Sequence, residues 1–227
     1  HNNQDGILVT ETAGSNTSVV IDHSEFANNG AGDGYSHGIY VSGVNSLTVT
    51  NSVFTGTYVG HEIKSRAAIT TITNNVIANG PTGTASYDID IPNAGVATIS
   101  GNVIEKGPNA SNNGIIHYGG ETQFSFANNS LTVTGNTVIN DDPSAGLIWN
   151  QSAVNGLTVT ANVTNNTLDN VSATDGTGLI SASNNTSLTV PTSSEPGYSL
   201  ALPCLGGTSI TPNTQPLTLT LTTGGNI

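Results

Sequence analysis

Short, similar segments recur along this chain of 227 residues, and their recurrence is the feature that most constrains its fold. Successive copies begin 23 to 32 residues apart. A repeat of this length predicts a solenoid, in which each unit buries its apolar side against its neighbours. The seven segments read GILVTE, GIYVSG, HEIKSR, YDIDIP, GIIHYG, GLIWNQ and GLISAS, and they begin at Gly6, Gly38, His61, Tyr87, Gly114, Gly146 and Gly178.

A second recurring segment joins a short strand to a polar turn. Its apolar column holds Ile21, Val49, Ile72, Ile99, Val133 and Val163, and its polar column holds Ser24, Ser52, Asn75, Asn102, Asn136 and Asn166. Stacked Asn side chains can hydrogen-bond along such a column. Val, Ile, Thr, Asn, Ser and Gly dominate the sequence, and no segment sustains a helical period. We therefore predict an all-β fold, a right-handed parallel β-helix of about seven coils over residues 1–190.

The last part of the chain has a different character. From Pro191 onward Pro, Ser and Gly accumulate and the repeat is lost, and a run of alternating Leu and Thr follows at residues 217–222. We interpret residues 191–227 as an irregular C-terminal tail that packs on the solenoid or extends it.

The repeat pattern resembles the pectate-lyase-like superfamily of right-handed parallel β-helices, whose members share the short strands, the Asn-bearing turns and the unequal coil lengths. The resemblance covers residues 6–190. It implies a bacterial polysaccharide lyase, epimerase or hydrolase, or a tailspike-like or adhesive protein. The Asp-Pro-His motif of alginate epimerases and the Asn-Thr-Asp and Gly-His-Gly motifs of polygalacturonase-like hydrolases are absent from the sequence. One fold supports many activities, so the activity has to be argued from individual residues.

The charge balance excludes two classes of partner. The formal net charge is −12, because the chain has only three Lys and Arg residues against 15 Asp and Glu. Nucleic acids and anionic membranes bind clustered Lys and Arg, so neither is an expected partner. No apolar run reaches the length of a membrane span. The low charge and the abundance of Thr, Asn and Ser are typical of bacterial β-solenoids that are secreted or held at the cell surface, which is where we place the mature chain.

Alternation along the first set of segments predicts which side chains face outward. We expect Leu8, Tyr40, Ile63, Ile89, Ile116, Ile148 and Ile180 to form one inward column. Their neighbours then point outward, and in the middle coils these neighbours are charged. With strands about 4.8 Å apart, the outward residues of coils three to five fall within a patch about 10 Å across. This patch contains Glu62, Lys64, Asp88, Asp90 and His117, with Arg66 on the same row.

The patch predicts a site for an acidic polysaccharide. In β-elimination a base removes the proton next to a carboxylate whose charge must be neutralised. Lys64 is the candidate base and Arg66 the candidate neutralising group, and His117 and Tyr118 are alternative proton donors. The predicted catalytic residues are Lys64, Arg66, Asp88, Asp90 and His117. The predicted substrate-binding residues at the edges of the patch are His61, Tyr87, Tyr118, Glu121 and Trp149.

Two other chemistries remain open for the same patch. Members of the resembling family often place acidic Ca²⁺ ligands on this kind of strand, which implies a calcium site at Glu62, Asp88 and Asp90. Paired carboxylates also serve glycoside hydrolases, and the pairs Asp88 with Asp90 and Glu62 with Asp88 have backbone spacings near those that inverting and retaining enzymes need. We expect Lys106, which precedes a Gly-Pro turn, to be a surface charge.

A structural or adhesive role is the alternative to catalysis. The alignment makes eight residues beside the inward column an outward apolar stripe, and a stripe of this size requires a cover. The open ends of a solenoid also favour association. Both features predict a homo-oligomer. The predicted stripe consists of Ile7, Val9, Ile39, Val41, Ile115, Leu147, Trp149 and Leu179.

Overall fold

The computed structural model separates the chain into two units, residues 1–188 and residues 189–227. The structure describes residues 4–12, 14–188, 198–201, 209–210 and 217–220.

The first unit is a parallel β-helix built from three sheets of seven strands each. In each sheet every pair of neighbouring strands is parallel. Sheet A contains β1 (Ile7–Thr10), β4 (Ile39–Ser42), β7 (Ile63–Arg66), β10 (Ile89–Ile91), β13 (Gly114–Gly119), β16 (Gly146–Gln151) and β19 (Gly176–Thr177). Sheet B contains β2 (Ser18–Asp22), β5 (Ser46–Thr50), β8 (Ile69–Thr73), β11 (Val96–Ser100), β14 (Ser130–Thr134), β17 (Ala161–Thr164) and β20 (Ile180–Ser183). Sheet C contains β3 (Glu25–Ala27), β6 (Val53–Thr55), β9 (Val76–Ala78), β12 (Val103–Lys106), β15 (Thr137–Asn140), β18 (Thr167–Asp169) and β21 (Thr186–Ser187).

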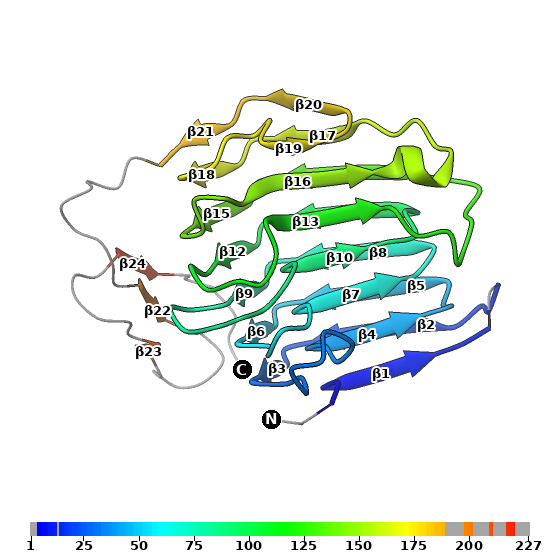
Figure 1. The fold of residues 1–227 in the computed structure, drawn as a ribbon, viewed down its shortest axis with the longest axis horizontal. Helices are drawn as coiled ribbons and strands as arrows, with labels where there is room; N and C mark the ends of the chain where they lie inside the picture. The colour runs from blue at the N-terminus through cyan, green and yellow to red at the C-terminus, as the bar shows by residue number, and fades with distance from the viewer. Residues whose placement is uncertain (1–3, 13, 189–197, 202–208, 211–216, 221–227) are drawn as a thin grey trace. The chain divides into compact units, whose positions relative to one another are not determined.

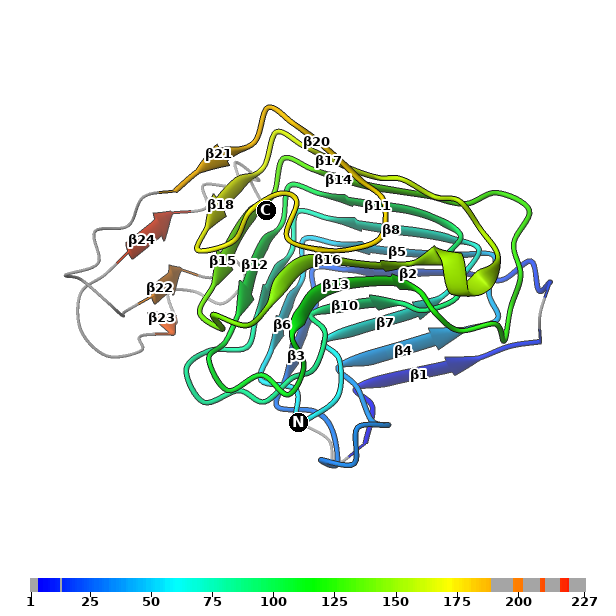
Figure 2. The ribbon, with the colours of Figure 1, turned by 45° about the horizontal axis from the view of Figure 1, so that its top comes forward.

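Each coil contributes one strand to sheet A, then one to sheet B and one to sheet C. The ribbon climbs through seven such coils as a right-handed solenoid, with sheet A facing the viewer (Figure 1). A second view shows sheets A and B facing each other while sheet C closes one side (Figure 2). The single helical element of the described residues is the short 3-10 helix η1 (Ser152–Asn155), which follows β16. The predicted all-β solenoid of about seven coils is confirmed.

The interior is an apolar stack, and the Asn column lies beside it as predicted. Ile72, Ile99 and Val133 are completely buried in successive strands of sheet B. At the turn that follows, Asn75 N–H donates to Asn102 Oδ1 at 2.9 Å, and Asn102 N–H donates to Asn136 Oδ1 at 3.0 Å. The same pattern continues through Asn166 and Asn185, so the ladder satisfies backbone amides along the solenoid.

The turns between sheets B and C share a left-handed backbone. One residue per coil has a positive φ there, a conformation that Asn and Gly adopt more easily than other residues. The column consists of His23, Asn51, Asn74, Gly101, Gly135, Asn165 and Asn184, with φ values from 47° to 66°. The left-handed backbone at this turn therefore explains why Asn and Gly recur at this position of the repeat.

The register of the first two coils differs from the prediction by one residue. Ile7 and Ile39, not Leu8 and Tyr40, share the inward column with Ile63. A slip of one residue turns every side chain of a strand to the opposite face. Leu8 is consequently 58% exposed. The prediction failed because it aligned strands on their first glycine, and Gly38 lies opposite Glu62 rather than His61, as the hydrogen bond from Ile39 N to Glu62 O shows.

The seventh predicted segment lies in a different sheet from the other six. Its residues Ile180–Ser183 form β20, which pairs with β17 in sheet B, so the prediction that Ile180 joins the inward column of sheet A was wrong. The sheet A strand of the last coil is β19, two residues long.

The predicted outward apolar stripe is also wrong for half of its members. Four of them, Ile39, Val41, Ile115 and Leu147, are completely buried. Leu179 is exposed, while Ile7 and Val9 are partly buried against the core. Homo-oligomer formation therefore has no continuous apolar stripe to support it.

The second unit contains one small sheet. Within it, β22 (Tyr198–Ala201) pairs antiparallel with β23 (Ser209–Ile210) and parallel with β24 (Leu217–Thr220). The predicted Leu and Thr run thus forms a strand over its first four residues. The packing predicted for the tail on the solenoid lies outside what the structure describes. Among the described residues, no helix is long and apolar enough to cross a membrane.

Candidate functional site

The outward face of sheet A carries a charged row across its middle coils. The backbone register places Lys64 beside Asp90 and Asp90 beside His117, and Trp149 follows in the next coil. The predicted convergence of Lys64, Asp90 and His117 on three adjacent strands is therefore present.

Asp90 is the centre of this row, and its carboxylate accepts three charged or polar donors. Oδ2 lies 2.6 Å from Nζ of Lys64 and 3.2 Å from Nε2 of His61, and Oδ1 lies 2.6 Å from Nδ1 of His117. Burial alone would raise the pKa of Asp90, but His61, His117 and Lys64 together outweigh burial and hold the pKa well below its usual range. We call His61, Lys64, Asp90 and His117 the Asp90 cluster.

The backbone fixes the tautomer of His61. Its Nδ1 accepts the N–H of Tyr87 at 3.2 Å, so Nε2 carries the proton that faces Asp90. His37 repeats the arrangement one coil earlier, because its Nδ1 accepts the N–H of His61 at 3.0 Å. Burial lowers the pKa of His61 to about 4 and that of His37 to about 3. Both rings are therefore neutral near pH 7 and serve to position their neighbours.

Close contact between two loops makes this stack of rings possible. A Cβ on Gly60 would lie 1.8 Å from the carbonyl oxygen of Ser36 and 3.0 Å from Nδ1 of His37. Only glycine lets the loop before His61 approach the loop before Gly38 so closely.

Rings stack along the solenoid axis above the Asp90 cluster. The His37 and His61 rings are 4.7 Å apart, the His61 and Tyr87 rings 5.4 Å, and the Tyr87 and His117 rings 4.7 Å. Trp149 lies at an angle to Tyr87 at 6.4 Å. Asp90 itself is 1% exposed, and the ring contacts bring the predicted edge residues His61, Tyr87 and Trp149 together around the cluster.

Gln151 is a site residue that the sequence reasoning missed. Its Oε1 lies 3.0 Å from Nε2 of His117, so His117 is held at both ring nitrogens. An amide side chain can turn its oxygen to a protonated Nε2 or its NH₂ to an unprotonated one. Gln151 can therefore support both proton states of His117.

Arg66 forms the second part of the site. Its Nε donates to the Tyr40 hydroxyl at 2.9 Å, NH1 donates to Asn93 Oδ1 at 2.6 Å, and NH2 lies 2.5 Å from Glu121 Oε2. Oε1 of Glu121 is 3.9 Å from Nζ of Lys64. The predicted residues Arg66 and Glu121 thus meet, and Tyr40 and Asn93 complete the arrangement. We call Tyr40, Lys64, Arg66 and Asn93 the carboxylate cradle.

Glu62 and Asp88 do not join Asp90 in one outward patch, in contrast to the prediction. Both are completely buried one residue before the inward Ile of their strands, where loops from sheet C cover them. Glu62 accepts hydrogen bonds from Thr57 N at 3.0 Å and Thr57 Oγ1 at 2.6 Å. Asp88 Oδ1 accepts the Asn79 amide at 2.6 Å. The residue before the inward position faces these loops rather than solvent, so alternation alone misplaced it.

Lys106 faces the same buried acids, although the sequence predicted a surface charge. It is fully buried, its Nζ lies 3.9 Å from Asp88 Oδ2, and it donates to the carbonyl of Ser86. Burial raises the pKa of Glu62 and of Asp88 to about 7 each, and the Lys106 charge opposes the shift at Asp88. We call Glu62, Asp88 and Lys106 the corner cluster.

Tyr118 is a core residue, which corrects its predicted place in the site. The side chain has no exposed surface, and its hydroxyl donates to the Gly95 carbonyl at 2.6 Å. Burial raises its pKa. Tyr118 follows His117 by one residue and so points into the solenoid, where no polysaccharide can reach it.

Glu62, Asp88 and Asp90 do not fit a shared calcium site. Both oxygens of Asp90 accept donors from the Asp90 cluster, and both oxygens of Glu62 accept donors from Thr57. The remaining oxygen, Asp88 Oδ2, faces the Lys106 ammonium, which repels a cation. Across the described part of the chain, no group of three His, Cys, Asp or Glu side chains is placed to hold a metal ion.

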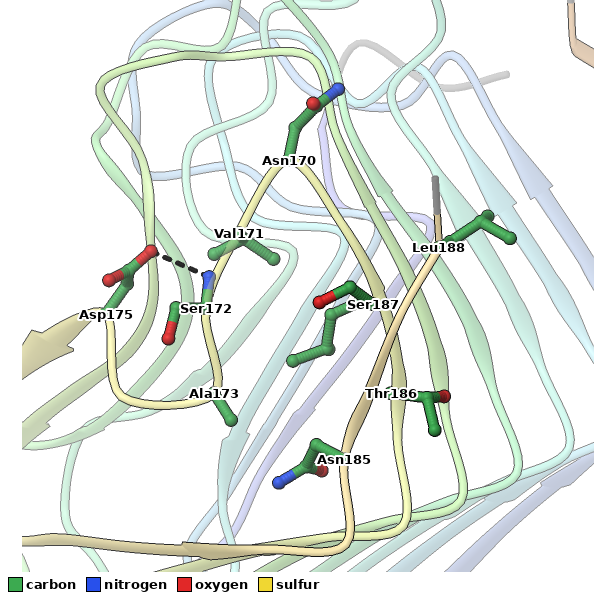
Figure 3. A pocket seen from close by; sticks show the side chains of 10 residues that line it. Asn170, Val171, Ser172, Ala173, Asp175, Asn185, Thr186, Ser187 and Leu188 are labelled. Atoms are coloured by element: carbon green, nitrogen blue, oxygen red, sulfur yellow. Dashed lines mark hydrogen bonds between the residues drawn. The ribbon is translucent and has the colours of Figure 1, made fainter. Parts of the chain in front are cut away.

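A separate cavity of about 480 Å³ lies at the last coil of the first unit (Figure 3). Asp175, which accepts the N–H of Ser172 at 2.7 Å, is the only titratable residue among those that line it. The cavity offers no pair of groups for acid and base chemistry. The remaining lining residues are Leu168, Asn170, Val171, Ser172, Ala173, Asn185, Thr186, Ser187 and Leu188.

Comparison with known proteins identifies no family for this chain. No protein-family model matches the chain, and no curated protein or solved structure matches it either.

Proposed function

We propose that this chain is a pectate-lyase-like protein that acts outside the cell on an acidic polysaccharide, by β-elimination at the Asp90 cluster. The observation that carries the proposal is the hydrogen bond of 2.6 Å between Asp90 and Nδ1 of His117, beside the cationic pair Lys64 and Arg66. A carboxylate that accepts from Nδ1 directs Nε2 away from itself, and a ligand that displaces the Gln151 amide from Nε2 can exchange a proton there.

The geometry changes the roles expected for the basic residues. Nζ of Lys64 is 2.6 Å from the ionised Asp90, and this ion pair stabilises the ammonium form. We therefore assign Lys64 the role of a positive charge in this proposal, in place of the expected role of base. In the proposed reaction Lys64 and Arg66 bind the uronate carboxylate, and their charge stabilises the negative charge that develops when the adjacent proton leaves.

His117 is the proposed base. Its unprotonated Nε2 takes the proton from C5 of the uronate, and the C–H electron pair forms the double bond between C4 and C5. The bond from C4 to the glycosidic oxygen breaks, and that oxygen takes up a proton. Tyr87, stacked on His117 at 4.7 Å, is the proposed donor, since burial raises its pKa and keeps its hydroxyl protonated.

Hydrolysis by the predicted carboxylate pairs has less support. Asp88 and Glu62 lie in the corner cluster, so neither is available to act with Asp90 across a glycosidic bond. A structural or adhesive role is the second candidate. Two features favour it: the charges of the site pair with one another, and the ring faces contact one another along the stack, so both sets of groups already bind partners within the protein.

A screen of the purified protein on polymers separates these functions. Pectate, alginate, glucuronan and neutral glycans are tested with Ca²⁺ and with a chelator, and the ultraviolet absorbance of unsaturated products is followed together with new reducing ends. We expect absorbance and reducing ends to appear together on one of the acidic polymers. Reducing ends without absorbance would indicate hydrolysis, and no product from any polymer would favour the structural role.

A further inference from the structure

Glu121 differs from the other charged residues that it contacts. It lies outside the strands, after β13, and its side chain is 45% exposed, whereas the side chains of Arg66 and Lys64 are nearly buried. Its carboxylate nevertheless reaches both cations, at 2.5 Å from Arg66 and 3.9 Å from Lys64. One half-exposed carboxylate therefore lies within ion-pair distance of two buried cations.

The cradle around Arg66 is held without help from the Glu121 carboxylate. Tyr40 and Asn93 accept from Nε and NH1 of the guanidinium, so these contacts fix its plane and leave NH2 to face Glu121. A fixed guanidinium edge suits the geometry of a carboxylate. The cradle thus presents a binding site for a carboxylate whether or not Glu121 fills it.

The backbone of Glu121 is anchored separately from its side chain. Its N–H donates to the Pro92 carbonyl at 2.9 Å, and its carbonyl accepts from the side chains of Asn93 and Asn155. The carboxylate can therefore turn into solvent without any rearrangement of the loop. An ion pair with one half-exposed partner adds little stability, so the cost of this turn is small.

We propose that the Glu121 side chain is an internal substitute for a ligand carboxylate, and that a uronate carboxylate binds the cradle by displacing it. This inference rests on the proposed function, because it takes the acidic polysaccharide as the ligand and assigns its carboxylate to Arg66 and Lys64. Glu121 then acts as a selectivity device. A uronate can replace the contacts that Glu121 gives up, and a neutral sugar cannot.

The test compares Glu121→Gln with the unmodified protein, using galacturonic acid, its trimer and neutral galactose as probes in calorimetric titrations. Loss of the competing carboxylate should strengthen the binding of galacturonate and its trimer about fivefold or more and leave galactose unaffected. Glu25→Gln is the matched control. Glu25 is exposed at the start of β3 in sheet C, and its replacement by Gln removes the same charge as Glu121→Gln does. Thermal unfolding verifies that each variant is folded.

The outcomes separate this inference from the proposed function. Tighter galacturonate binding by Glu121→Gln supports the inference even if no polymer is cleaved by either protein, because binding of a monosaccharide needs no turnover. Equal or weaker binding by Glu121→Gln overturns it, even if the unmodified protein cleaves a polymer. The absence of galacturonate binding in both proteins, or an equal gain in Glu25→Gln, also overturns it.

Discussion

Oδ1 of Asp90 lies 2.6 Å from Nδ1 of His117, a residue on the neighbouring strand of sheet A. The hydrogen bond orients the imidazole and turns Nε2 toward Gln151, whose amide a ligand would replace. Because His61 and Lys64 also donate to Asp90, one carboxylate fixes three side chains from two coils.

Replacing this carboxylate tests its organising role. Asp90→Asn puts an amide NH₂ where one of three donors now binds, and it leaves Lys64 with only the more distant Glu121 carboxylate, at 3.9 Å, as a counter-ion. We expect polymer cleavage to fall by about 10² to 10⁴ and the free energy of unfolding to fall by about 3 kcal/mol. Initial rates and denaturant unfolding measure both. Asp33→Asn is the control, because an Asn oxygen can still accept from Tyr35 N and Ser36 N; equal losses in the two variants would contradict the prediction.

Replacing Tyr118 tests whether it is a proton donor, as the sequence predicts, or a core residue, as in the structure. If its hydroxyl donated a proton to the substrate, Tyr118→Phe would lose most of the activity. In the structure the hydroxyl only donates to the Gly95 carbonyl, which also accepts the N–H of Ser130. We expect a loss of about 1 kcal/mol in the free energy of unfolding and unchanged initial rates. A rate that drops tenfold in a folded variant would place Tyr118 in the site after all.

The Asn ladder should stabilise the solenoid more than its exposed polar residues do. Asn102→Ala removes the acceptor of Asn75 N and the donor to the Ile72 carbonyl, both inside the protein. The expected cost is about 2 to 4 kcal/mol. Asn162 is an exposed residue of β17, and Asn162→Ala should change the free energy of unfolding by less than about 0.5 kcal/mol. Similar values for the two variants in urea unfolding would show that the ladder contributes little.

The corner cluster makes stability depend on pH. Burial raises the pKa of Glu62 from 4.5 to about 7, so the folded protein holds a proton that the unfolded chain releases between these values. The stabilisation that this proton gives is complete below about pH 4.5 and is lost as the pH rises through about 7.

Glu62→Gln removes this titration; its oxygen can still accept from Thr57 N–H, and its NH₂ can donate to the Thr57 hydroxyl oxygen. At about pH 5 the two proteins should unfold with similar free energies, and at about pH 8 the variant should be more stable by up to about 3 kcal/mol. The comparison cancels the opposite effect of His37 and His61, whose lowered pKa values favour the unfolded state as the pH falls below 6.5. A difference that does not change with pH would refute the raised pKa.

The sequence predicted the fold and three members of the Asp90 cluster because both depend on periodicity. Lys64, Asp90 and His117 follow the inward Ile of their strands by one residue, so a period of two places them outward. The same rule could have found Gln151, which lies two residues after Trp149 and faces the same way. It was missed because an uncharged amide was not considered as part of a charged site.

The incorrect predictions share a different cause. Glu62 and Asp88 lie where a strand leaves a corner, and the loops that bury them follow no period that the sequence displays. Asn93 and Glu121 meet Arg66 across 27 and 55 residues of sequence, through a turn and a loop. Side-chain alternation indicates which face of a strand a residue occupies, and loop conformation decides what covers that face.

His117→Gln tests the central claim most directly. Glutamine can hydrogen-bond to Asp90 and Gln151 but cannot take a proton from a uronate, so the variant should keep the fold and lose elimination. On the acidic polymer that the unmodified protein cleaves best, we expect the rate of unsaturated-product formation to fall by about 10² or more with the melting temperature little changed. The same rate in both proteins, or no product from the unmodified protein on any acidic polymer, would contradict the account.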